Sequence, residues 1–270
     1  MLKDITFGQY YEGNSPVHKT DPRAKIVLLI AMIVFVFLAN NIFSVVFAAL
    51  SVFTLMYISG VPLRMYAKNL KAILPIIIFT AFINVFYGDK NTGIVFEVWK
   101  LTVTWGGIYR AFFMATRIIL LIFISSALTY TTTPNDLTDA IERLLSPLKY
   151  VGLKSAVHIL AMMMTITLRF IPTLIEETEK IMNAQKARGA DLENGNLKQR
   201  VKALIPILIP LLISAIRRSY ELAEAMECRC YNGGEGRQRM KQLHFSFRDY
   251  IACGVVFAVG AVIILLNILL

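Results

Sequence analysis

Two arginines in this sequence lie between small residues, each at the end of a segment that begins apolar and turns charged. Arg188 lies in Ala187-Arg188-Gly189, and Arg229 lies in Cys228-Arg229-Cys230. A guanidinium stays charged and carries five donors, and small neighbours let the backbone of a partner come close to it. One such tripeptide has an ordinary explanation, since cations and glycine favour the C-terminal ends of helices. The repetition favours another reading, in which both arginines insert into grooves lined by carboxylates or carbonyls.

No catalytic or metal-binding pattern accompanies the two tripeptides. The sequence contains none of G-x-x-x-x-G-K-[ST], H-E-x-x-H and G-x-S-x-G, so it predicts neither a P-loop ATPase nor a hydrolase of these kinds. Cys228, Cys230 and Cys253 form no disulfide framework, and the three histidines are scattered. We therefore expect a protein that is not an enzyme and has no cofactor or metal.

The composition predicts a membrane protein. Hydrophobic residues make up 56% of the 270 residues and charged residues only 17%, and the charges gather between apolar runs. A soluble core of this size needs less apolar surface, so much of it must face lipid. The net charge of +10 is expected in cytoplasmic loops, where Lys and Arg hold the topology. A basic chain can also bind nucleic acid, but the hydrophobicity argues against that partner.

Five apolar runs are predicted to cross a bilayer, the first two as a tight helical hairpin. They are Ile26–Ala39, Ile42–Ile58, Leu70–Tyr87, Ile108–Tyr130 and Tyr250–Leu270. If the N-terminus is inside, the inner segments hold most of the Lys and Arg, and the outer loops hold only Lys90 and Lys100. The positive-inside rule therefore predicts a cytoplasmic N-terminus and an outer C-terminus. Arg117, inside the fourth run, must face other helices or water.

Two further apolar stretches, Ser155–Leu168 and Ala203–Ile216, are shorter than a span requires. If both crossed the membrane, the basic linker that holds Lys186 and Lys198 would lie outside, against the positive-inside rule. We expect both stretches at the inner interface or packed against the spans. A seven-span arrangement is the alternative.

The segment between the fourth and fifth runs is expected to form three helices. The first opens at Pro134, the second runs from about Lys154 to Arg188 and stops at Gly189, and the third runs from about Leu197 to Cys230. Both long helices begin apolar and end charged. This pattern suggests levers that have one end in the membrane and present the other to a soluble partner.

These expectations define the fold class. We predict an all-α integral membrane protein with about five transmembrane helices and a cytoplasmic or interfacial coupling segment of three helices, two of them long. The predicted parts are a membrane part with four spans (1–130), the coupling helices (131–249) and a C-terminal transmembrane helix (250–270).

Four stretches in fixed order carry a family resemblance. They read TDPRAKI at 20–26, TTTPNDLTDAIERLLSPL at 131–148, LRFIPTLIEETEKIMNAQKARGAD at 168–191 and AEAMECRCYNGGEGR at 223–237. With them the chain resembles the transmembrane T component (EcfT, CbiQ-like family) of energy-coupling factor (ECF) transporters. The ordered set, which ends in two x-Arg-x helix tips, is specific, whereas DPR or TTTP alone is weak.

The resemblance implies a function and partners. It implies a multi-pass scaffold in the cell membrane of a prokaryote, which joins two cytoplasmic ABC-type ATPases, a homodimer or a heterodimer, to a small membrane S component for uptake of vitamins or other micronutrients. Arg188 and Arg229 fall on the coupling arginines of the family, each inserting into a groove of one ATPase. Met162, Met163 and Met164 could contact S components, because Met repacks easily, or could simply fill a helix. Cysteines flank Arg229 where Ala and Gly are common, which favours a type shared among several S components.

Two other classes of protein can be weighed against this function. A self-sufficient channel or secondary carrier predicts polar or acidic residues that line a pore, and the predicted spans contain no acidic residue. A membrane-embedded enzyme needs clustered catalytic residues, and the sequence offers none. The substrate cannot be named from this chain, because the resemblance places specificity in another polypeptide.

Overall fold

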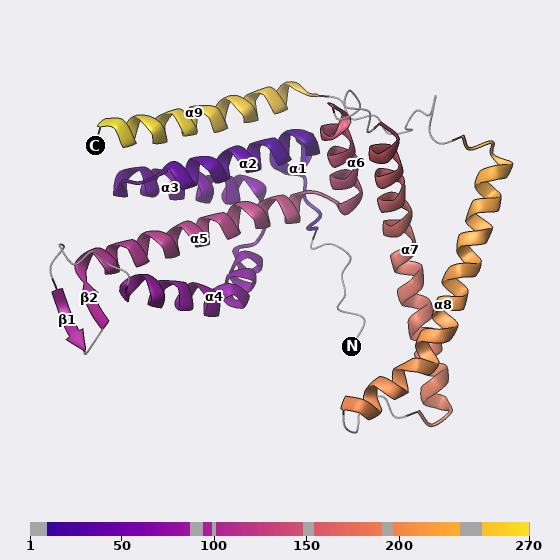
Figure 1. Ribbon diagram of the computed structural model, residues 1–270. Coiled ribbons are helices and arrows are strands. Elements are labelled where there is room, and N and C mark those ends of the chain that lie inside the picture. The colour runs from indigo at the N-terminus through magenta and orange to yellow at the C-terminus, as the bar shows by residue number, and fades with distance from the viewer. Residues whose placement is uncertain are drawn as a thin grey trace. The chain divides into compact units, whose positions relative to one another are not determined.

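The structure is a computed structural model that describes residues 10–86, 94–98, 101–147, 154–190, 197–232 and 245–269 (Figure 1). The helices and strands in these ranges are α1 (Pro16–Lys19), α2 (Pro22–Leu38), α3 (Ile42–Ser59), α4 (Leu63–Phe86), β1 (Ile94–Val98), β2 (Leu101–Thr104), α5 (Trp105–Thr131), α6 (Pro134–Leu144), α7 (Lys154–Ala187), α8 (Leu197–Cys228) and α9 (Phe247–Leu269). The prediction of an all-α membrane protein is confirmed. The short antiparallel pair of β1 and β2, in which Val98 lies opposite Leu101, was not predicted.

The chain divides into two compact units. The bundle unit is the described part of 8–133 and 243–270, and the hairpin unit is the described part of 134–242. These boundaries come from packing alone. The division into a membrane part and a cytoplasmic coupling segment stays a prediction.

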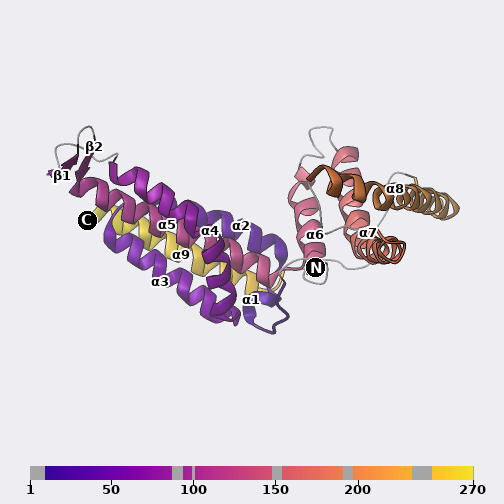
Figure 2. The ribbon, with the colours of Figure 1, turned by 90° about the horizontal axis from the view of Figure 1, so that it is seen from below.

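The bundle unit packs its helices side by side (Figure 1 and Figure 2). Helix α5 contacts α2, α3 and α4, and α9 covers α2 and α3. Tyr66 lies at the centre of the core, with its ring edge-on to the rings of Tyr130 at 5.3 Å and Phe123 at 6.1 Å. Helices α4 and α5 approach closely at Gly107, where an added Cβ would overlap the carbonyl oxygen of Val85.

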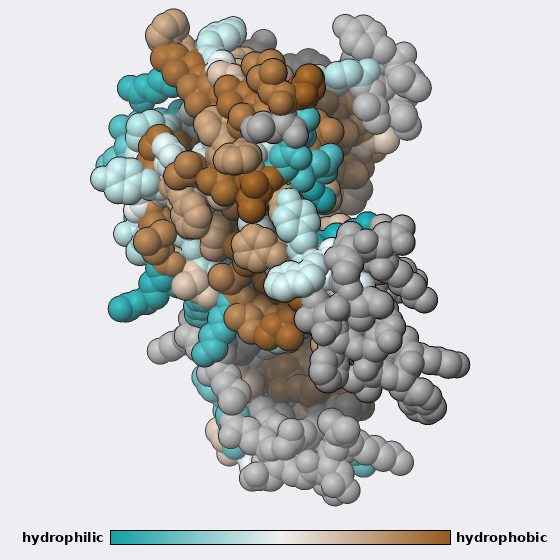
Figure 3. All heavy atoms as spheres, turned by 90° about the vertical axis from the view of Figure 1, so that its left-hand side faces the viewer, coloured by the Kyte–Doolittle hydropathy of each residue, from teal (hydrophilic) through white to brown (hydrophobic). Residues whose placement is uncertain are grey.

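Apolar side chains also cover the outside of the bundle unit (Figure 3). Ile30 and Phe37 of α2, Leu50 of α3, Phe79 of α4 and Phe112 of α5 are each more than half exposed. A soluble protein rarely exposes so much contiguous apolar surface, so these side chains are placed to face lipid.

The described residues of the five predicted spans lie in α2, α3, α4, α5 and α9 of the bundle unit, except Ala39, which follows the end of α2. Six helices in the described part of the chain are long and apolar enough to cross a membrane: α3, α4, α5, α9 and the greater parts of α7 and α8. Helix α2 has 17 residues, one fewer than the 18 that define these six helices. The interfacial placement of the apolar halves of α7 and α8 stays a prediction, and Lys90 and Lys100 lie outside the described residues.

A buried polar junction joins the N-terminal segment to two distant helices. Asp249, only 1% exposed, accepts hydrogen bonds from the backbone N–H of Asp21 at 2.8 Å and of Ser246 at 2.7 Å. Lys25 donates from Nζ to the carbonyl oxygen of Thr131 at 2.8 Å, at the end of α5. The start of α2 is thereby tied to the start of α9 and the end of α5, so these three helix ends lie at one level.

The opposite end of α2 is held by polar side chains from α9 and α5. The side-chain oxygen of Asn267 accepts from the backbone N–H groups of Asn40 and Asn41 at 3.2 and 3.3 Å, and its amide donates to the carbonyl oxygen of Leu38. Arg117 donates to the carbonyl oxygen of Ala39 at 2.9 Å. Arg117 therefore faces another helix, as expected from its position, and satisfies an otherwise unpaired carbonyl at the helix end.

Candidate functional site

Helix α7 ends in a cap that fixes the position of Arg188. Gly189 takes a left-handed conformation with φ +86°, and its N–H donates to the carbonyl oxygen of Lys186 at 3.0 Å. The next N–H, of Ala190, donates to the carbonyl oxygen of Gln185 at 3.0 Å. These two bonds define a Schellman motif with Arg188 as the C-cap residue and Gly189 at C′. The expected stop at Gly189 is confirmed.

Helix α8 ends in the same motif in the same register. Cys230 has φ +54°, its N–H donates to the carbonyl oxygen of Glu227 at 2.9 Å, and the N–H of Tyr231 donates to the carbonyl oxygen of Met226 at 3.1 Å. Arg229 is thus a C-cap residue, as Arg188 is. Among the described residues, Cys230 alone has a positive φ without being glycine, a conformation that costs an L-residue with a Cβ roughly 1–2 kcal/mol.

Both arginines are exposed at the surface of the hairpin unit. Within the described part of the chain, neither guanidinium has a hydrogen-bond acceptor or an ion-pair partner. A C-cap cation is favoured by the partial negative charge of the helix end, which holds the charge beside the cap. Each helix therefore ends in a defined cap from which an exposed, charged guanidinium extends.

A polar contact fixes how α7 and α8 cross. Glu177 of α7 accepts from Arg218 of α8 at 2.7 Å, and its other carboxylate oxygen accepts from the hydroxyl of Ser214. The side chains of Glu177 and Arg218 are 21% and 32% exposed, so solvent screens this pair only partly. A charge-assisted bond of this length is among the stronger hydrogen bonds in proteins.

Contacts on both sides of this crossing show that the two helices run antiparallel. Gln185, near the end of α7, donates to the carbonyl oxygen of Pro206, near the start of α8, at 3.5 Å. Tyr231, just after α8, lies 3.4 Å from Nε2 of His158, near the start of α7. His158 also lies 3.7 Å from Glu142 of α6. Figure 1 shows α7 and α8 running in opposite directions. Each helix is about 50 Å long, so Arg188 and Arg229 stand at opposite ends of the pair.

Because α7 and α8 are antiparallel, the change from apolar to charged residues runs in opposite directions along the two helices. The apolar half of each helix lies beside the charged half of the other, so the pair has no common membrane end. The expected lengths of α7 and α8 are confirmed, whereas the lever that we inferred for each helix, with one end in the membrane, stays a prediction. Arg188 lies 11 residues after Glu177, and Arg229 lies 11 residues after Arg218, so the two tips extend equally far from the crossing in opposite directions.

Two apolar surfaces of the hairpin unit are open. Met163 of α7 is 55% exposed, while Met162 and Met164 are partly buried, so Met163 is the most accessible of the three, and their contact with an S component stays a prediction. The larger surface, which we call the α8 stripe, was missed as a contact surface. Its members are 47–62% exposed and follow one another at helical spacing: Leu204, Ile205, Leu208, Ile209, Leu212, Ile213 and Ile216. The apolar run was visible in the sequence, but its exposure depends on how α7 packs.

No group of three or more His, Cys, Asp or Glu side chains among the described residues could hold a metal ion. The arrangement can, however, dock a partner that is itself two-fold symmetric, because two equivalent cationic tips lie at opposite ends of an antiparallel pair.

Comparison with known proteins identifies the family. The family model described as "CbiQ: Cobalt transport protein" matches residues 13–241, so the chain belongs to the CbiQ family. It is 50% identical to the "Energy-coupling factor transporter transmembrane protein EcfT" of Ruminiclostridium cellulolyticum, over 99% of this chain and 98% of that protein. The proteins of the same name from Clostridium kluyveri and Bacillus subtilis are 51% and 44% identical, over 95% and 92% of this chain and 95% and 93% of their own lengths.

Proposed function

We propose that this chain is the transmembrane coupling subunit of an ECF-type importer, which links two ABC-type ATPases in the cytoplasm to a small membrane S component. The observation that carries the proposal is the pair of C-cap arginines at opposite ends of the antiparallel α7–α8 pair. Arg188 enters a groove of one ATPase and Arg229 enters the equivalent groove of the other. The class of transporter in this proposal is taken from the names of the relatives, which are called EcfT.

The antiparallel geometry suits a dimer of ATPases, homomeric or heteromeric. ABC-type ATPases work as two-fold pairs, and a single groove cannot receive both tips because they are tens of ångströms apart. When ATP binding draws the ATPases together, the tips move with them, and the angle at the Glu177–Arg218 crossing changes. The apolar surfaces of α7 and α8 then move the S component.

The S component and lipid together cover the apolar surfaces of the hairpin unit. The α8 stripe is the larger contact, and Met163, flanked by Met162 and Met164, supplies an adaptable one. The chain itself binds neither ATP nor the transported micronutrient. A carrier that works alone is disfavoured, because α2, α3, α4 and α5 contain no Asp or Glu.

The first experiment removes both tip charges. Arg188→Ala/Arg229→Ala is expressed with its two ATPases and an S component, next to the matched control Arg169→Ala/Arg217→Ala, which removes two exposed arginines from the same helices away from the tips. Truncating one partner of a docked charge pair costs about 2–5 kcal/mol. We expect the tip variant to lose copurification of the ATPases, or to retain hydrolysis without uptake, while the control behaves like the wild type. Full uptake by the tip variant would refute the assignment.

The second experiment tests the orientation, with a cytoplasmic N-terminus and tips and an outer C-terminus. Cys228 and Cys230 are exposed at the end of α8, and Cys253 is partly buried in α9. In a Cys253→Ala background, a membrane-impermeant maleimide should label the protein in broken cells and leave it unlabelled in intact cells. Equal labelling of intact cells would place the tips outside and contradict the proposal.

A further inference from the structure

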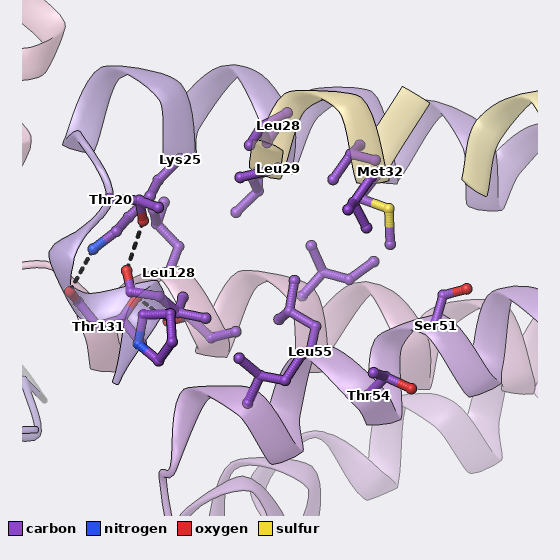
Figure 4. A pocket seen from close by; sticks show the side chains of 18 of the residues that line it. Thr20, Lys25, Leu28, Leu29, Met32, Ser51, Thr54, Leu55, Leu128 and Thr131 are labelled. Atoms are coloured by element: carbon purple, nitrogen blue, oxygen red, sulfur yellow. Dashed lines mark hydrogen bonds between the residues drawn. The ribbon is translucent and has the colours of Figure 1, made fainter. Parts of the chain in front are cut away.

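The bundle unit contains a cavity that the coupling function does not use. It has a volume of about 460 Å³ and lies between α2, α3, α5 and α9 (Figure 4). Its wall is formed mainly by aliphatic side chains, among them Leu28, Leu29 and Met32 of α2, Leu55 of α3 and Val255 and Val259 of α9. Such a wall offers water few hydrogen bonds, so the cavity favours an apolar occupant.

One end of this cavity is polar and positively charged. Lys25 lies there with Thr20 and Thr131, at the level where α2 and α9 begin and α5 ends (Figure 4). Arg248, in the first turn of α9, lines the same end and is exposed. Within the described residues no acceptor lies within hydrogen-bonding distance of the Arg248 guanidinium. The cavity thus has an aliphatic interior and a cationic mouth at the ends of transmembrane helices.

We infer that this cavity binds one acyl chain of an anionic phospholipid, whose phosphate lies at Arg248 beside Lys25. The ends of membrane-spanning helices lie at the level of the lipid head groups, where basic side chains meet lipid phosphates. A guanidinium matches a phosphate with two parallel hydrogen bonds. A protein helix could fill the aliphatic part, but it would not bring an anion to Arg248, so the charge at the mouth selects the lipid.

Substitutions can separate the contribution of the aliphatic cavity from that of the charge at its mouth. Ala252→Phe, on α9, and Thr54→Phe, on α3, each place a ring in the cavity from a different wall. Ala258→Phe makes the same change at an exposed residue of α9 that is not among the residues lining the cavity. Arg248→Gln removes the charge at the mouth, and Arg64→Gln removes an exposed charge at the start of α4 that does not line it.

The test is native mass spectrometry of the full chain in detergent, titrated with phosphatidylglycerol or with phosphatidylcholine of the same acyl chains. We expect one phosphatidylglycerol to bind about tenfold more tightly than phosphatidylcholine, corresponding to one strong charge contact. Arg248→Gln should abolish this preference, and both ring-inserting variants should lose the bound lipid, while Ala258→Phe and Arg64→Gln keep it.

Thermal unfolding of each variant separates loss of the cavity from loss of the fold, and the conclusion is drawn from whichever ring-inserting variant unfolds like the wild type. Equal binding of the two lipids by the wild-type chain would overturn the inference. So would retention of phosphatidylglycerol by a folded ring-inserting variant, or a loss of preference in Arg64→Gln equal to that in Arg248→Gln.

Discussion

The two units of this molecule differ in how far their charged groups are buried and bonded. The bundle unit buries Asp21, Lys25 and Asp249 and binds each of them to backbone groups or side chains from other segments. The hairpin unit leaves Arg188, Arg229 and the α8 stripe exposed, and among its described residues a partly buried carboxylate, Glu177, joins the two long helices where they cross. The bundle unit therefore satisfies its buried polar groups internally, whereas the hairpin unit exposes charged and apolar surfaces that a partner or lipid can cover.

The two units differ most clearly at one carboxylate in each, Asp249 in the bundle unit and Glu177 in the hairpin unit. Each of these carboxylates accepts two hydrogen bonds. Asp249→Ala leaves the buried N–H group of Asp21 and the partly buried N–H group of Ser246 without their acceptor, which should cost about 3 kcal/mol in the free energy of unfolding. Glu177→Ala removes a contact that water can partly replace, and should cost about 1 kcal/mol.

Unfolding of both variants in detergent measures this difference. Asp249→Asn, which keeps an acceptor oxygen, and Glu177→Gln serve as the matched conservative changes, and Asp249→Asn should recover part of the loss. The distinction between the units would be wrong if Glu177→Ala proved as destabilising as Asp249→Ala.

The helices were predictable because their signals are local. Long apolar runs specify transmembrane helices, and Gly189 after a charged turn specifies a helix end. The arrangement of the helices was not predictable, because it depends on pairs far apart in the chain. Asp249 meets Asp21, and Glu177 meets Arg218, through contacts that no spacing rule encodes.

At the candidate site too, local features could be predicted from the sequence and the arrangement in space could not. Both arginine tripeptides were found from residue types, and the Gly189 cap followed from the glycine. The left-handed Cys230 gave no signal, since cysteine is not a residue that favours positive φ. The opposite placement of the two tips could not be inferred either, because it requires the antiparallel crossing of α7 and α8.

The two tips can be compared with each other through their C′ residues. Cys230→Gly removes the Cβ from a left-handed residue and should stabilise the end of α8 by roughly 1 kcal/mol, with coupling unchanged. Gly189→Ala introduces a similar cost at the end of α7. Nothing lies within 4 Å of the added Cβ, so the cost comes from the backbone alone.

Amide hydrogen exchange at the two helix ends checks both changes. Exchange should slow near residues 226–231 in Cys230→Gly and quicken near residues 185–190 in Gly189→Ala. If Cys230→Gly instead abolished uptake while its helix end became more protected, the cysteine itself would have a role at the ATPase contact.

The smallest effect concerns His18, in the N-terminal segment outside the transmembrane helices. Burial lowers the pKa of His18 below its ordinary value; the hydrogen bond with the carbonyl oxygen of Tyr11 opposes this shift, and the positive charge of Lys25 adds to it. The hydroxyl of Ser15 lies 2.6 Å from Nδ1, and the carbonyl oxygen of Tyr11 lies 2.9 Å from Nε2, which suits a neutral imidazole with its proton on Nε2. The folded chain therefore binds fewer protons here than the unfolded chain does.

The sign of the pH dependence follows from this difference. Stability from His18 is fully present above the ordinary pKa, near 6.5, and is lost as the pH falls below it, because the unfolded chain takes up the proton first. Between pH 7.5 and 5.5 the bundle unit should lose less than about 1 kcal/mol from this group. Unfolding of the wild type and of His18→Asn at both pH values measures the loss, and the variant should show the shallower decline. An equal decline in both proteins would assign the pH dependence to other groups and leave the polar junction of the bundle unit insensitive to His18.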